Sequence, residues 1–343
     1  KPDELVMMTR NLGSMLVAGL PLSRALSVIE RQSSNPRLQG VIKTVQARIT
    51  KGDQFNEALT QFPGTFNDLY VAMVRAGEES GSLADALQIL SVQMERASSL
   101  KKKIKGAMIY PSIVLIIMVG IGILMMIYVM PSITSTFKSL GSDLPPTTKA
   151  LIAASDFMKN NTLLALGGMA LSVALFIYAL RTPIGKRVFS WIIIRLPIIG
   201  NIAKEANAAQ MARTLSSLLS SGVDVLRALT ITQDVVQNFY YKRLIATASE
   251  RVEKGSPLSE TFIERKDLYP ILVGEMIAVG EETGQIANML KELAVFYENE
   301  VEHKTDDLST IIEPLLMVVI GGTVGFFALA MIAPIYSIAD SIK

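Results

Sequence analysis

Cysteine is absent from the 343-residue chain, and histidine occurs once, at His303. Without cysteine the chain forms no disulfide bond and offers no thiolate as a nucleophile or metal ligand. The single histidine lies in a charged stretch, which favours a solvated helix residue over a metal ligand or catalytic base. We therefore predict no cofactor, no metal site and no catalytic residue.

Charge of one sign is also lacking, because 33 Lys and Arg residues balance 31 Asp and Glu residues and leave a formal net charge of +2. So small a charge gives no electrostatic footprint for nucleic acid, which we exclude as a partner. No Gly-x-x-x-x-Gly-Lys-Ser/Thr segment occurs, so the sequence has no phosphate-binding loop of that type. We predict that the protein is not an enzyme.

Half of the residues are hydrophobic, and the excess lies in three blocks at 106–137, 162–180 and 315–339. Each meets or approaches the length of about 20 apolar residues that crosses a bilayer. None is a signal peptide, because the first begins more than a hundred residues into the chain. The fold class that we predict is an all-α, multi-pass membrane protein with three transmembrane helices.

The distribution of basic residues predicts the topology. Four lysines precede the first block within 101–105, three lie in the whole loop 131–161, and Arg181, Lys186 and Arg187 follow the second block. Because positive charge gathers on the cytoplasmic side of membrane helices, the N-terminus is predicted to be cytoplasmic and the loop 131–161 extracytoplasmic. By parity, the C-terminus is extracytoplasmic. The apolar stretch 188–202, broken by Arg195 and Pro197, is either a connector at the membrane surface or a linker buried against the second module.

An internal repeat extends over about 125 residues at a constant offset of 203 positions, without a gap. It includes the membrane blocks, since Pro111 and Pro131 correspond to Pro314 and Pro334. The repeated unit is therefore a helical module together with one transmembrane helix. Other matching pairs are Arg10 and Arg213, Gly19 and Gly222, Arg24 and Arg227, Gly52 and Gly255, Gly77 and Gly280, Glu78 and Glu281, Glu79 and Glu282, and Gly81 and Gly284.

Within a module the apolar residues recur at helical spacing, for example at Leu38, Val41, Ile42, Val45 and Ile49. Glycine, proline and asparagine divide the remainder, which predicts two repeated six-helix cytoplasmic bundles, the last helix of each running on into the membrane. The predicted segments are cytoplasmic module 1 at 1–106, transmembrane helix 1 at 107–131, an extracytoplasmic loop at 132–161, transmembrane helix 2 at 162–180, the connector with module 2 at 181–309, and transmembrane helix 3 at 310–339.

Several short motifs, taken in order, resemble the type II secretion F domain, the family of inner-membrane platform proteins of type IV pili and type II secretion systems. The resemblance covers both repeats and nearly the whole chain. The motifs are Thr9-Arg10-Asn11-Leu12, Gly19-Leu20-Pro21-Leu22, Ala25-Leu26, Phe62-Pro63, Ala76-Gly77-Glu78-Glu79-Ser80-Gly81 and Ile109-Tyr110-Pro111.

The resemblance implies a non-enzymatic platform in the bacterial inner membrane that couples a hexameric assembly or retraction ATPase to the insertion of pilin or pseudopilin subunits. Other inner-membrane assembly proteins and the lipid bilayer are the further partners that it implies. Pilus assembly, protein secretion and competence stay open, and a membrane transporter is the alternative of a different class. Against a transporter, the three blocks carry no central charge.

The resemblance also bears on chain length and on assembly. Many family members carry a further N-terminal segment, so we expect this sequence to be part of a longer chain. A single copy would serve a hexameric motor poorly, so we expect a homodimer or small homo-oligomer that forms through the spans or the first modules.

The Gly-Glu-Glu-x-Gly turns at 77–81 and 280–284 are the sharpest local features. We interpret them as helix corners in which glycines supply positive φ and the acids lie near the next helix N-terminus. A partner contact is the functional alternative. Candidate interface residues are Arg24, Glu78, Glu79, Arg227, Glu281, Glu282, Pro111 and Pro314.

The family resemblance sharpens the expectation for the arginines. In the secretion branch, an acid at the position of Arg24 joins the turn glutamate in a calcium site, so the arginines here imply no calcium site. We predict that Arg24 pairs with Glu78 and Arg227 with Glu281. We also expect the two prolines to kink the helices or to mark their entry into the membrane.

Overall fold

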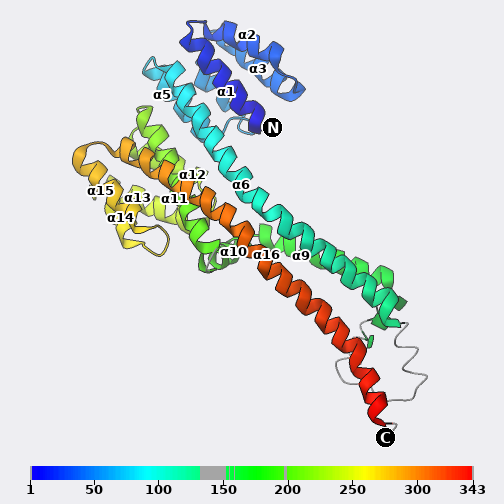
Figure 1. The fold of residues 1–343 in the computed structure, drawn as a ribbon. Helices are drawn as coiled ribbons and strands as arrows, with labels where there is room; N and C mark the ends of the chain where they lie inside the picture. The colour runs from blue at the N-terminus through cyan, green and yellow to red at the C-terminus, as the bar shows by residue number, and fades with distance from the viewer. Residues whose placement is uncertain (1, 132–151, 154, 158, 197–198, 342–343) are drawn as a thin grey trace. The chain divides into compact units, whose positions relative to one another are not determined.

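The computed structural model describes residues 2–131, 152–153, 155–157, 159–196 and 199–341, and within these ranges it contains helices and turns but no β-strand (Figure 1). The prediction of an all-α protein is therefore confirmed for the described residues. The extracytoplasmic loop predicted at 132–161 falls largely outside them.

Module 1 is built from helices that pack side by side and share one core. They are α1 (Pro2–Val17), α2 (Leu22–Gln32), α3 (Pro36–Thr50), α4 (Phe55–Thr60), α5 (Asp68–Glu79) and α6 (Leu83–Leu124), and a π-helical turn, η1 (Met125–Val129), continues α6.

Module 2 repeats this order. Its helices are α11 (Ile199–Ser220), α12 (Val225–Val235), α13 (Phe239–Glu253), α14 (Leu258–Glu264), α15 (Ile271–Thr283) and α16 (Ile286–Ser341). From α2 to α6, every helix starts 203 positions before its counterpart in module 2. The register of the sequence repeat is therefore also the register of the structure.

The same local signals end the helices of both modules. Gly81, with φ of 70°, follows α5, and Gly284, with φ of 69°, follows α15. Only glycine adopts this left-handed conformation without strain, which makes it the common residue just after a helix. At the other end, the side chains of Asn35 and Asn238 accept hydrogen bonds from backbone N–H groups in the first turns of α3 and α13.

The core of each module contains buried tyrosines, at positions that do not correspond in the repeat. In module 1 the hydroxyls of Tyr70 and Thr9 lie 3.0 Å apart. In module 2 the Tyr241 hydroxyl donates to the Leu268 carbonyl at 2.7 Å, and its ring meets Tyr269 edge to face. Burial of these rings removes a large apolar area from water and fixes how the helices pack.

The two modules form one compact unit, which comprises residues 1–103 and 187–304. Helix α5 of module 1 packs against α11 and α12 of module 2. The buried side chain of Gln93, on α6, donates to the Thr214 hydroxyl at 3.2 Å and accepts from the Ser217 hydroxyl at 3.2 Å. The modules therefore contact each other through buried polar groups as well as through packed helices.

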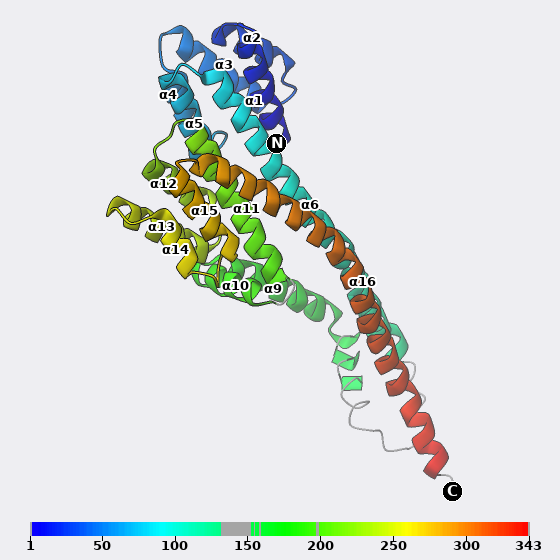
Figure 2. The same cartoon turned by 60° about the vertical axis from the view of Figure 1, so that its left-hand side comes forward.

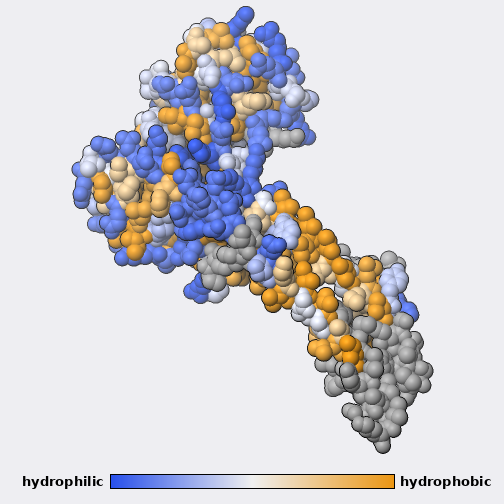
Figure 3. All heavy atoms as spheres, in the orientation of Figure 1, coloured by the Kyte–Doolittle hydropathy of each residue, from blue (hydrophilic) through white to orange (hydrophobic). Residues whose placement is uncertain are grey.

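The second unit, residues 104–186 and 305–343, holds the apolar segments. Two described helical stretches are long and apolar enough to cross a membrane, Leu83–Val129 and Ile286–Phe326. There α6 and α16 run side by side (Figures 1 and 2) and line a cavity of about 180 Å³ between them. Hydrophobic residues cover their surface (Figure 3), as expected of helices that face lipid.

Helix α9 (Thr162–Arg181) coincides within one residue with the predicted second transmembrane segment. That it crosses the membrane stays a prediction. It is followed by α10 (Pro183–Arg195), which carries exposed Val188, Phe189 and Trp191. Arg187 lies 4.4 Å from the ring centroid of Phe239 in module 2. Helix α10 thus contacts module 2 and also exposes an apolar surface of the kind that binds a membrane interface.

Candidate functional site

The carboxylate of Glu78 lies at the N-terminus of α4. It accepts hydrogen bonds from the backbone N–H groups of Phe55 and Asn56, both at 2.7 Å, and from Nδ2 of Asn56 at 2.6 Å. The first N–H groups of a helix have no partner within the helix, and the helix dipole favours a negative charge there. Glu78 therefore caps a helix that starts 23 residues earlier in the chain.

Glu281 has the same arrangement in module 2. Its carboxylate accepts from the backbone N–H groups of Leu258 at 2.6 Å and Ser259 at 3.1 Å, and from the Ser259 hydroxyl at 2.5 Å. The side chain at the second helical position differs, Asn56 in one module and Ser259 in the other, but both donate to the carboxylate. The cap is thus a property of the repeated module.

These contacts correct the predicted pairing of Arg24 with Glu78 and of Arg227 with Glu281. Among the ion pairs of the described residues, neither pair occurs, and each glutamate is held by helix N-terminal donors instead. Neither carboxylate needs a basic side chain to balance its charge. The oriented N–H groups of α4 and α14 provide a positive potential without a charged side chain.

The helix-corner interpretation of the turns also needs revision in detail. Glu78 lies within α5 and reaches α4, whereas we expected the acids to act on the following helix. Gly77 is required for close packing: a Cβ there would lie 2.6 Å from the Ala86 Cβ, and at Gly280 it would lie 2.8 Å from the Ile286 Cα. Only the last glycine of each turn has positive φ.

The second glutamate of each turn is exposed. Glu79 lines a groove of about 590 Å³ between the modules, which we call the intermodule groove. Module 1 contributes α5 to one wall, and the α11–α12 turn of module 2 forms the other. The charged residues that line the groove are Asp68, Arg75, Glu79, Asp224 and Arg227. Two of the predicted residues, Glu79 and Arg227, therefore line the same groove, in a combination that the sequence did not suggest.

One repeated ion pair differs sharply between the modules. In module 2, Arg213 Nε and Nη2 donate to the two carboxylate oxygens of Glu298 at 2.8 and 2.7 Å, and the two side chains are only 11% and 12% exposed. In module 1 the equivalent pair of Arg10 and Glu95 is 49% and 54% exposed. A buried, bidentate pair leaves a costly unpaired charge if one partner is removed, whereas an exposed pair contributes little.

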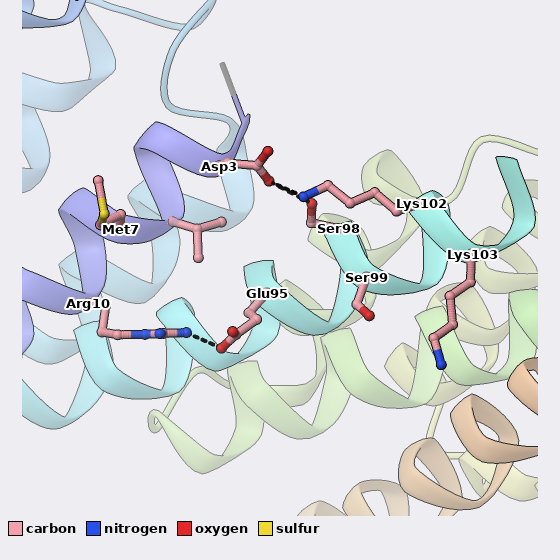
Figure 4. Close-up of a pocket in the computed structure, with 9 residues that line it drawn as sticks. Asp3, Met7, Arg10, Glu95, Ser98, Ser99, Lys102 and Lys103 are labelled. Atoms are coloured by element: carbon pink, nitrogen blue, oxygen red, sulfur yellow. Dashed lines mark hydrogen bonds and ion pairs between the residues drawn. The ribbon is translucent and has the colours of Figure 1, made fainter. Parts of the chain in front are cut away.

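The exposed pair borders a polar groove between α1 and α6 (Figure 4). Asp3 and Arg10 extend from α1 towards Lys102 and Glu95 of α6. The hydrogen bond from Lys102, at 2.7 Å, lowers the pKa of Asp3. One of the four lysines at 101–105, Lys102, thus also joins the first helix to α6.

Further ion pairs lie where α6 and α16 leave the modules. Lys103 of α6 pairs with Glu302 of α16, and Lys304 pairs with Glu205 of α11. Burial acts to lower the pKa of Lys304, but the hydrogen bond and charge of Glu205 outweigh it and raise the pKa. Burial also raises the pKa of Tyr297 to about 12. These contacts join the two helices to the modules and to each other.

Sequence reasoning missed these residues for identifiable reasons. Glu205, Asn56 and Gln93 lie in helices where nothing in the local pattern distinguishes them from solvated polar residues. The matching of Arg10 with Arg213 and of Glu95 with Glu298 was visible, and a shared charge pair at one offset could have identified this ion pair. The difference in burial between the two copies of the pair could not have been predicted from the sequence, because burial depends on how the modules pack.

The two prolines lie inside continuous helices: α6 runs through Pro111 and α16 through Pro314. No group of three or more potential metal ligands occurs among the residues that the structure describes.

Comparison with known proteins bears out the resemblance. The family described as "Type II secretion system (T2SS), protein F" matches residues 8–131 and 211–334. The chain belongs to this family. The two matched segments are separated by the same 203 positions as the sequence repeat, and each contains one module and its apolar helix.

Curated relatives cover nearly the whole chain and carry two kinds of name. "Type IV pilus assembly protein PilC" of Thermus thermophilus is 37% identical over 99% of this chain and 84% of its own length. The Pseudomonas aeruginosa protein of the same name is 30% identical over 99% and 91%. "Type II secretion system protein F" of Vibrio cholerae is 33% identical over 97% and 82%.

Proposed function

We propose that this protein is a non-enzymatic, multi-pass platform of the bacterial inner membrane that couples a cytoplasmic assembly ATPase to the insertion of pilin subunits during type IV pilus assembly. Family membership supports a role in pilus or secretion machinery. The observation that carries the mechanical part is that both modules belong to one unit from which two long helices extend into apolar segments.

The packing of the modules constrains the topology. Because the two modules share one compact unit, we infer that they lie on the same side of the membrane. If α6 carries the chain across the bilayer, the chain must cross again before module 2 begins, and α9 is the apolar helix available between them. This supports three crossings, with both modules cytoplasmic and the C-terminus outside.

A platform of this kind acts by binding its partners rather than by catalysing a reaction. A motor that contacts the modules can transmit movement through α6 and α16, because each is one continuous helix from the module into the apolar segment. The chain itself supplies no phosphate-binding loop of the Gly-x-x-x-x-Gly-Lys-Ser/Thr type. Energy from nucleotide hydrolysis would come from the partner, in keeping with a division between motor and platform.

The direct test is co-purification with the hexameric assembly ATPase from membranes that contain both proteins. We expect a complex that the charge reversals Glu79→Lys and Glu282→Lys weaken. The neighbouring exposed residue Glu57→Lys, outside the turns, is the matched control. Retention of pilin insertion after loss of the ATPase complex would contradict the proposal.

Protein secretion is the second candidate, because curated relatives at similar identity carry the secretion name. Deletion of the gene should remove surface pili and leave secreted protein levels unchanged if pilus assembly is correct. The reverse result would favour secretion. A transporter would instead show substrate flux in vesicles that contain this chain alone.

A further inference from the structure

The contact between the two modules joins different faces of the repeated unit. Module 1 contributes α5 and α6, and module 2 contributes α11 and the start of α12. We call the first surface the tail face and the second the head face. The tail face is Asp68, Ala76, Glu79 and Gln93 in module 1 and the equivalent Ile271, Val279, Glu282 and Phe296 in module 2. The head face is Thr214, Ser217 and Arg227 in module 2 and the equivalent Asn11, Ser14 and Arg24 in module 1.

Because the contact is head to tail, it uses only one face of each module. Gln93 on the tail face of module 1 is 4% exposed, since α11 covers it. Its equivalent Phe296 on the tail face of module 2 is 47% exposed. The chain therefore contains one filled and one open version of the same surface.

The open tail face is apolar. Ile271 is 58% exposed and Val279 is 47% exposed. Of their equivalents in module 1, which line the intermodule groove, Ala76 is partly buried and Asp68 is exposed. Hydrophobic residues reach the surface of module 2 over the region of α15 (Figure 3). Large apolar side chains at equivalent positions of a known contact surface indicate a docking site.

Exposed apolar side chains lie beside the open head face of module 1, on the same helix as Asn11 and Ser14. Met7 and Val17 of α1, at the positions of Gln210 and Ser220 in module 2, are 62% and 58% exposed. Between them on the same helix lies exposed Ser14, equivalent to the buried Ser217. The tail face of module 2 is therefore more apolar than that of module 1, and apolar side chains lie beside the open head face, as a contact that excludes water requires.

The charged residues of the contact also have equivalents on the two open faces. Glu79 and Arg227 line the intermodule groove together. Their equivalents Glu282 and Arg24 are both exposed and take part in no ion pair of the described residues. In the same arrangement between two copies, Glu282 and Arg24 would line one groove as Glu79 and Arg227 do, and their opposite charges favour this register of docking.

We propose that the tail face of module 2 binds the head face of module 1 in a second copy of this chain. The contact repeats between copies the arrangement that joins the modules within one copy. It is heterologous, so successive copies add head to tail until a ring closes. This goes beyond the platform function, because it concerns self-association and needs no motor or pilin.

Cross-linking between two singly substituted chains tests the register, and the natural absence of cysteine makes each introduced thiol unique. Arg24→Cys and Glu282→Cys chains are co-expressed and treated in membranes with a short bifunctional thiol reagent. We expect a product of twice the chain mass only when both variants are present. The intrachain control is Glu79→Cys with Arg227→Cys in one chain.

Failure to form the mixed product while the intrachain control reacts would overturn the proposal. So would an equal yield from Glu282→Cys alone, which indicates a symmetric contact between tail faces. A product that joins Glu282→Cys to a different protein would show that the open face serves another partner.

A second measurement does not depend on thiol chemistry. Phe296→Asp should weaken self-association in detergent by about tenfold or more, measured by analytical ultracentrifugation. Val295→Asp is the matched control, because its module 1 equivalent Val92 stays 48% exposed in the filled contact. Equal effects of the two substitutions, or no effect of Phe296→Asp, would contradict the proposal.

Discussion

Adjacent glutamates in each Gly-Glu-Glu turn have separate roles. Glu78 and Glu281 are held by the N-terminal donors of α4 and α14, whereas Glu79 and Glu282 are exposed. The sequence analysis singled out Glu78 and Glu281 within the turns but assigned them arginine partners rather than helix N–H donors. Their difference depends on a helix that lies 22–23 residues earlier in the chain.

Replacement of the capping acid should therefore destabilise its module. Glu78→Ala leaves the first N–H groups of α4 without their acceptor, and we expect a loss of about 2 kcal/mol in unfolding free energy. Thermal unfolding of the detergent-solubilised protein, followed by circular dichroism, measures the change. The control Glu79→Ala should stay within about 0.5 kcal/mol of the parent protein. Equal losses for both variants would exclude the cap as the cause.

The arginine–glutamate pair occurs in both modules, buried in module 2 and exposed in module 1, so the same ion pair can be compared at two degrees of burial. Glu298→Ala strands the buried guanidinium of Arg213 and should cost about 3 kcal/mol or more, while Glu95→Ala should cost about 0–1 kcal/mol. The same unfolding measurement on the two variants gives the difference. A loss for Glu95→Ala as large as that for Glu298→Ala would show that exposure does not govern the pair.

At the scale of helices, much of the fold could be predicted from the sequence. Periodic apolar residues, asparagine caps and the glycines after helices act locally, so the repeat and the helical character of the modules were visible in the pattern. The ion pairs of Arg24 and Arg227 were predicted wrongly, because charge complementarity along a sequence does not reveal backbone donors that come from another helix. The covering of Gln93 by α11 was equally invisible, since it depends on the contact between modules.

The close approach of α5 and α6 at Gly77 leads to one prediction. Gly77→Ala places a methyl group 2.6 Å from the Ala86 Cβ between α5 and α6. The helices must separate, and we expect a loss of about 1–3 kcal/mol in unfolding free energy.

The matched control is Gly40→Ala in α3, where an added Cβ has no neighbour within 4 Å. Alanine favours a helix over glycine, so this change should stabilise the module by about 0.5–1 kcal/mol. Opposite signs in thermal unfolding are the expected result. A loss in both variants would contradict the packing argument.

At the scale of the whole molecule, duplication explains the odd number of proposed crossings. A module with one membrane helix, used twice in the same orientation, needs a return crossing between the copies, which we assign to α9. Both modules are then placed where a cytoplasmic motor can reach them. The platform proposal depends on this arrangement, because a module on the outer side could not contact such a motor.

Accessibility of single introduced cysteines in intact cells tests that claim most directly. The positions are Lys43→Cys on exposed α3, Glu253→Cys on exposed α13 and Ser142→Cys in the predicted extracytoplasmic loop. A membrane-impermeant thiol reagent should label only Ser142→Cys until the inner membrane is opened, after which it should label all three. Labelling of Glu253→Cys from outside, with Lys43→Cys protected, would place the modules on opposite sides and contradict the account.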